Sequence, residues 1–177
     1  MSADHGGPAA PAPPAPLVPV AEVRRRTPAE EARTLVAATN VATLATLSED
    51  GTPWASLVTF GALDDGAPVL LVSTLAEHGR NLARDPRASL AVAAPGADAE
   101  PLAGARVTLA GVAERPAGAD LAAARTAHLA AVPTAAQYVD FTDFTLWVLR
   151  VHRVRWVGGY GRMRSVTGAD YAAAGEG

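Results

Sequence analysis

The chain has 177 residues, of which 49% are hydrophobic and 19% charged, and its formal net charge is −3. This balance is typical of one globular domain and gives no indication of a general nucleic-acid binder. There is no cysteine, and all 15 basic residues are arginine, which excludes disulfides, thiolate catalysis and every chemistry that needs a lysine amine.

The two ends differ in composition from the middle. Residues 1–22 are mostly alanine, proline and glycine, a composition that predicts a disordered leader. Residues 163–177 predict a flexible tail, which leaves residues 23–162 as the folded domain. No apolar run approaches the ~20 residues that span a bilayer, and no signal-peptide pattern is present. We therefore expect a cytoplasmic protein without a membrane partner.

The predicted elements are helices and short strands. A helix begins at Thr27, where "TPAE" offers an N-cap, a proline at the first helical position and a capping-box glutamate. Six strands joined mostly by turns, with few crossover helices, indicate a mainly β (α+β) fold: an antiparallel barrel with flanking helices. In chain order, the patterns predict a helix at 27–40, strands at 41–47, 54–63 and 69–75, a helix at 77–85, strands at 88–94 and 106–114, a helix at 120–132 and a strand at 145–157.

The stretch "VSTLAEHGRNL" carries the first candidate site. If the strand ends at Ser73 and the helix starts just after Thr74, two hydroxyls and free backbone amides gather at a helix N-terminus, which favours an anion. His78, Arg80 and Asn81 could add donors, and a phosphate would fit this set. The alternative is a plain capping box, with Thr74 as N-cap and the glutamate of "TLAE" closing it.

Two strands carry further candidates. In "WASLVTF", a strand edge with small and polar residues could lie along a flat ring, with Ser56 as the contact; the alternative is an ordinary half-buried strand. In "RVHRVRWVGGYGRMR", the polar residues change faces near Val151, which predicts either a bulge or a change from core to partner surface. The aromatic residues Trp156 and Tyr160 around "GG" suit stacking, and the alternative there is a surface strand with a glycine turn.

Metal and acid–base motifs are missing from the sequence. No histidine pair has metal-ligand spacing, no HExxH occurs and no GxSxG elbow is present. Asp140 and Asp143 in "YVDFTDF" fit turn or cap residues better than a catalytic pair. We therefore expect no resident metal bound by protein side chains alone, and no catalytic residue can be named.

Together, "STLAEHGRNL", "YVDFTDF" and "RWVGGYG" resemble the pyridoxamine 5'-phosphate oxidase-like FMN-binding split barrels, and within them the haem-utilisation (HugZ-like) branch. The resemblance runs from about Thr27 to Gly161. It implies a six-stranded split barrel, a homodimer and a cofactor at the subunit interface. It further implies that Ser56, Leu57 and Val58 flank the flavin ring, that Ser73, Thr74, His78, Arg80 and Asn81 hold its phosphate, and that Trp156, Tyr160 and Arg162 come from the partner subunit.

The resemblance leaves three functions open. The first is an FMN-dependent oxidoreductase acting on a small molecule, since the cofactor would supply the chemistry. The second is a haem-binding or haem-degrading protein, for which His152 is the plausible iron ligand near that end of the chain. The third is a protein that binds the deazaflavin F420, or binds flavin without catalysis. The chain departs from the family in having no lysine at the phosphate and no histidine after Gly161.

Overall fold

The computed structural model describes residues 24–94, 100 and 102–175, so the leader predicted at 1–22 lies outside the described residues. The elements in chain order are α1 (Pro28–Ala37), β1 (Val41–Leu47), β2 (Pro53–Ala62), β3 (Pro68–Ser73), α2 (Glu77–Arg84), β4 (Arg87–Ala93), β5 (Arg106–Glu114), α3 (Gly118–Ala131), a 3-10 turn η1 (Pro133–Gln137), β6 (Phe144–Val157), β7 (Met163–Thr167) and α4 (Gly168–Ala173).

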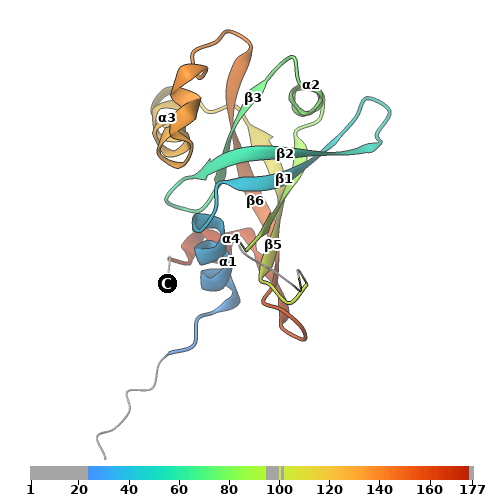
Figure 1. Ribbon diagram of the computed structural model, residues 1–177, viewed down its shortest axis with the longest axis vertical. Helices are drawn as coiled ribbons and strands as arrows, with labels where there is room; N and C mark the ends of the chain where they lie inside the picture. Colours follow the sequence, from blue (N-terminus) through green and yellow to red (C-terminus); the bar gives the residue numbers. More distant parts are fainter. Residues whose placement is uncertain (1–23, 95–99, 101, 176–177) are drawn as a thin grey trace, which may run out of the picture.

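The strands close into an antiparallel barrel. Their order is β3-β2-β1-β4-β5-β6-β7, and an additional pairing of β3 with β6 closes the ring of six. Strand β7 lies outside the ring against the second half of β6, where Arg153 pairs with Thr167 and Val157 with Met163. This architecture confirms the predicted six-stranded barrel, and the helices flank it, with α1 and α4 side by side at one end (Figure 1).

Local sequence signals account for the first elements. Thr27 caps α1 by accepting a hydrogen bond from the Glu30 N–H, and the Glu30 carboxylate accepts one from the Thr27 N–H, which confirms the predicted capping box. Strand β1 alternates between inside and outside, with Ala42 and Leu44 buried and Val41 and Thr43 exposed. Successive side chains of β1 therefore point alternately into the barrel and out of it.

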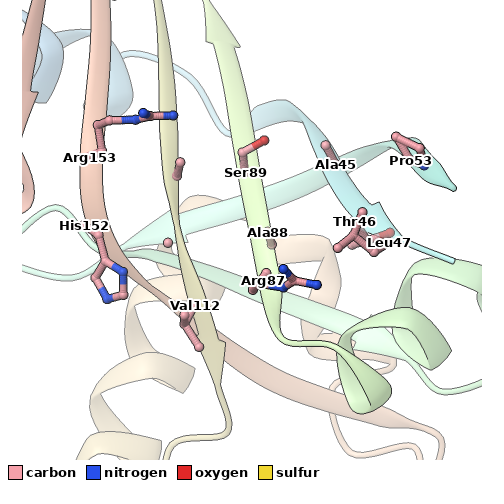
Figure 2. A pocket seen from close by; sticks show the side chains of 12 residues that line it. Ala45, Thr46, Leu47, Pro53, Arg87, Ala88, Ser89, Val112, His152 and Arg153 are labelled. Atoms are coloured by element: carbon pink, nitrogen blue, oxygen red, sulfur yellow. The ribbon is translucent and has the colours of Figure 1, made fainter. Parts of the chain in front are cut away.

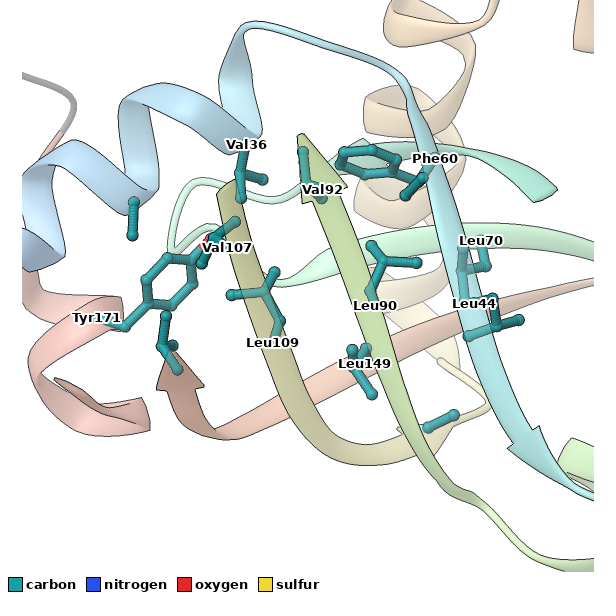
Figure 3. Close-up of a cluster of buried hydrophobic side chains, with 14 of the residues drawn as sticks. Val36, Leu44, Phe60, Leu70, Leu90, Val92, Val107, Leu109, Leu149 and Tyr171 are labelled. Carbon is teal, nitrogen blue, oxygen red and sulfur yellow. The ribbon is translucent and has the colours of Figure 1, made fainter. Parts of the chain in front are cut away.

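The core occupies the barrel interior and its α1 end. Phe60, Leu90, Leu109 and Leu149 meet inside the ring, and Val36 of α1 packs against them (Figure 3). A second, smaller apolar cluster lies between α3 and the outside of the wall formed by β3 and β6; its buried members are Ala67, Val69, Ala124, Leu146 and Val148. Two layers of apolar contact thus hold β6 along its length.

The C-terminal segment contains β7 and α4, within the stretch from residue 163 for which the sequence predicts a flexible tail; its flexibility stays a prediction. Strand β7 pairs with β6, and α4 buries Tyr171 in the main core. The buried Arg33 of α1 donates hydrogen bonds to the carbonyl oxygens of Tyr171, Ala172, Ala174 and Asp64. No local sequence pattern predicts the contact of Arg33 with α4, because more than 130 residues separate Arg33 from Tyr171, Ala172 and Ala174.

Strand β6 contains the predicted bulge. Arg153 pairs with Ala110 of β5, and Val151 pairs with Gly111. His152 is therefore an extra residue that pairs with no residue of β5. Leu149 and Val154 are both fully buried although five positions separate them. The extra residue therefore reverses which residues of β6 face the core.

No helix of the described residues is both long and apolar enough to cross a membrane. The cytoplasmic location stays a prediction.

Replacing Arg33 tests how α4 is held. Arg33→Met keeps the stem but removes a guanidinium that binds four carbonyl groups, so we expect a loss of about 3 kcal/mol in unfolding free energy. Arg125→Met removes an exposed ion pair with Asp140 and should cost less than about 1 kcal/mol. Urea denaturation measures both, and equal effects would contradict the assigned role of Arg33.

The buried His128 on α3 makes stability depend on pH. Its Nδ1–H donates to the Val69 carbonyl oxygen, 3.1 Å away, because a carbonyl can only accept. Its Nε2 is buried and has no hydrogen-bond partner among the residues that the structure describes. Burial lowers the pKa of His128 below its ordinary 6.5, and the hydrogen bond to Val69 opposes this only in part. The unfolded chain therefore binds a proton more readily than the folded one below that pH.

We expect the unfolding free energy of the wild type to fall as the pH drops below about 6.5, since the neutral imidazole stabilises the fold only above that pH. In His128→Gln, a side-chain amide can still donate to Val69 but does not titrate, so the decline between pH 7.5 and 5 should be smaller. The remaining decline includes His78, whose pKa burial also lowers. Urea denaturation at several pH values checks this, and identical slopes in both proteins would refute it.

Candidate functional site

The turn between β3 and α2 holds the residues predicted to bind a phosphate. The Ser73 hydroxyl donates to the Asp143 carboxylate at 2.6 Å and accepts from the Leu75 N–H. The Thr74 N–H donates to the Asp143 carbonyl oxygen at 2.7 Å. Asp143 of the "DFTDF" segment therefore already accepts hydrogen bonds from the Ser73 hydroxyl and the Thr74 N–H, two of the donors that an anion would need. Helix α2 has Ala76 as N-cap without a side-chain hydrogen bond, so the alternative capping box at Thr74 does not form either.

Arg80 and Asn81 of this predicted set also have partners within the chain. Arg80 pairs with Glu77 at 2.5 Å and donates to the Leu75 carbonyl oxygen. Asn81 is fully buried and donates to the Thr46 hydroxyl at 3.0 Å. His78 is half-buried, which lowers its pKa. Asn81 thus faces the barrel wall and Arg80 the surface, and their assignment to an FMN phosphate stays a prediction.

The residues predicted on β2 lie on the β1–β2 hairpin, which projects from the barrel (Figure 1). Leu57 is 77% exposed, while Ser56 and Val58 are half-buried. Their exposure would allow a flat ligand or a second chain to contact them. Their role beside a flavin ring stays a prediction.

The residues predicted to reach a partner subunit behave differently from one another. Trp156 is 3% exposed and belongs to the core of its own barrel, and its contact with a cofactor of the partner subunit stays a prediction. The bulge at His152 accounts for this burial, because the extra residue turns Trp156 inward. Tyr160 is exposed, and Arg162 lies over the Trp156 ring and pairs with Glu31. Only Tyr160 and Arg162 remain accessible to another molecule.

A groove on the outside of the barrel is the site that the sequence reasoning missed. It has a volume of about 640 Å³ and runs across β1, β4, β5 and β6 (Figure 2). One row of its floor follows the strand register directly: Ala45 pairs with Ser89, Ser89 with Ala110, and Ala110 with Arg153. Ala45, Ser89 and Ala110 therefore give this row of the floor short side chains.

Positive charge and one imidazole border this floor. Arg87 of β4 and Arg153 of β6 lie on either side of β5, and His152 stands next to Arg153 (Figure 2). Arg87 pairs with Asp85 at 2.5 Å and lowers the pKa of that carboxyl to about 2. Within the described part of the chain, Arg153 and His152 have no hydrogen-bond or ion-pair partner. The groove thus combines an apolar floor, an uncompensated cation and a potential metal ligand.

A signal for this groove exists in the sequence. In "ASLAVAA" and "RVTLAGVA", the most deeply buried inward residues are Leu and Val, whereas most of the outward residues are Ser, Ala and Thr. A strand face that meets only water usually carries longer polar or charged side chains. Two neighbouring strands with short outward residues indicate a surface that something flat can approach.

No group of three or more His, Asp or Glu side chains that could hold a metal ion occurs among the described residues.

The fold defines the class of the protein. The closed six-stranded barrel with β7 outside it is the split barrel of the pyridoxamine 5'-phosphate oxidase-like proteins. Residues 23–173 match the model of the family described as CREG, beta-barrel, and the chain belongs to this family.

Two relatives are similar in sequence as well. The structure of a heme binding protein from Mycobacterium smegmatis has 68% sequence identity and a TM-score of 0.84, and the match covers 86% of this chain and 63% of that one. The chloroplast heme oxygenase HOZ of Arabidopsis thaliana is 39% identical over 137 residues, which are 76% of this chain and 41% of HOZ. The chain therefore spans less than two thirds of the length of either relative.

The heme storage protein HutZ of Vibrio cholerae has the same fold, with a TM-score of 0.54 at 19% identity. This likeness supports the fold alone. The predicted resemblance to the split barrels, including neighbours of the haem-utilisation branch, is confirmed.

Asn81 offers a test of whether the predicted phosphate set is structural. Asn81→Ala removes the partner of the buried Thr46 hydroxyl and of Arg84, so we expect a loss of about 2 kcal/mol in unfolding free energy. Arg80→Ala removes only exposed contacts and should cost less than about 1 kcal/mol. Denaturation in urea without added cofactor measures both, and an Asn81 variant as stable as the wild type would contradict the structural role.

Proposed function

We propose that this protein binds haem in the outer groove of the barrel. The groove itself is the main observation in support, because its floor of small side chains lies between Arg87 and Arg153 with an imidazole beside it. Haem is a flat apolar ring with two carboxylates and an iron atom that accepts nitrogen ligands. Each of these three features finds a matching group in the groove.

The names of the relatives support the same ligand. The mycobacterial protein is called a heme binding protein and HOZ a heme oxygenase, and both are more than 30% identical to this chain. No comparable observation favours flavin, since Ser73 and Asn81 use their polar atoms inside the chain. The FMN-dependent oxidoreductase, F420 binding and the homodimer stay predictions.

The residues of the chain would each contribute a separate part of the binding. Ala45, Ser89 and Ala110 would let the ring lie close to the sheet, because short side chains leave the floor unobstructed. Arg153 would bind a carboxylate through two parallel hydrogen bonds, and Arg87 would add positive charge from the other side of β5. The haem iron would supply any redox chemistry, while the groove shields one face of the ring from water.

Blocking the floor tests this proposal. Ala110 points outward from the middle strand of the floor, so Ala110→Phe should fill the groove without disturbing the core and abolish hemin binding. Ala122→Phe places the same ring on the exposed side of α3 and should bind like the wild type. Absorbance titration with hemin measures the affinity, and thermal unfolding confirms that both variants fold.

The same titration compares the candidate cofactors. We expect wild-type protein to bind hemin with a shifted Soret band and to retain it in the presence of excess FMN or F420. Failure of the wild type to bind hemin, or equal binding by Ala110→Phe, would reject the outer groove as a haem site. Displacement of hemin by FMN would favour the flavin prediction instead.

A further inference from the structure

The bulge in β6 gives two consecutive residues the same direction. In a regular strand, neighbouring side chains point to opposite faces of the sheet. Here Val154 is fully buried, and the two residues before it, His152 and Arg153, are both exposed and both line the groove (Figure 2). The extra residue opposite the Ala110–Gly111 step makes this possible. Without it, one of the two side chains would point into the barrel.

Two glycines fix the backbone at this point from opposite sides. A Cβ on Gly111 of β5 would overlap the Arg150 carbonyl oxygen. A Cβ on Gly168 at the start of α4 would overlap the Val151 carbonyl oxygen and lie 2.9 Å from the His152 Cα. Both neighbours approach the bulge too closely for any side chain. The bulge is therefore held by packing from β5 and from α4.

His152 is the only groove residue with a ligand atom that suits haem iron. The described residues lining the groove include no tyrosine, methionine or second histidine, and the sequence has no cysteine. A neutral imidazole is a common haem ligand, whereas serine and threonine hydroxyls and arginine are not. The other two described histidines are unsuited: His128 is buried behind β3, and His78 lies on α2.

We propose that His152 is the protein ligand of the haem iron and that the bulge exists to present it together with Arg153. This inference rests on the proposed haem-binding function. Consecutive Cα atoms are about 3.8 Å apart, and the arginine side chain is the longer of the two. With the iron held by His152, Arg153 would be placed to bind a carboxylate at the edge of the ring.

The test uses the full chain and hemin. We expect His152→Ala to weaken hemin binding by about 10-fold or more, equal to about 1.4 kcal/mol, and to change the Soret band and the electron paramagnetic resonance spectrum. Added imidazole should restore the wild-type spectrum by occupying the vacated position. Arg153→Gln should lower the affinity but leave the spectrum unchanged, because it acts on the carboxylates and not on the iron.

His5→Ala is the matched histidine control and should bind hemin with the wild-type affinity and spectrum. If His152→Ala binds hemin with an unchanged spectrum, the ligand assignment is wrong while the haem-binding function stands. A spectral change in His5→Ala instead would move the ligand to the N-terminal segment and also overturn the inference. If the wild type binds no hemin, the proposed function itself fails.

Discussion

The change of partners along β6 is the constraint on which the rest of the structure depends. The first part of β6 pairs with β3 and closes the barrel, and its second part pairs with β7 outside the ring. Strand β5 pairs with β6 across the point where the partner of β6 changes, so β5 must bend together with β6 there. An extra residue in β6 increases the local twist and bend of the strand, which lets one continuous strand serve both pairings.

The same feature links the core to the surface. Because the bulge reverses the inward face, Leu149 and Val154 both reach the interior and Trp156 closes its end. On the outside, it leaves His152 and Arg153 beside a floor of short side chains. The support from α4 extends this dependence to the C-terminus, since Arg33 binds the end of α4. The groove is thus stabilised by contacts far from it.

Regular features were predictable from the sequence because they depend on neighbouring residues. The bounds of β1 and β5 match the predicted strands, and the capping box at Thr27 and the bulge near Val151 are confirmed. The orientation of Trp156 was not predictable, because a shift of one residue in the bulge reverses every later side chain. The packing of α4 was not predictable either. It involves a contact between Arg33 and Tyr171, which no local pattern connects. The groove was not predictable from local patterns, because its floor forms only where four strands lie side by side in the right order.

The distribution of charge decides between the two regions that could hold an anionic ligand. At the turn after β3, the hydroxyl and amide donors already face the Asp143 carboxylate, and Glu77 neutralises Arg80. A phosphate there would have to displace one acid and approach another. In the outer groove, Arg153 has no acidic partner within the described residues, and Arg87 is matched by Asp85 alone. A ligand carrying carboxylates on a flat apolar body therefore meets less electrostatic opposition in the groove, and its ring gains apolar contact there as well.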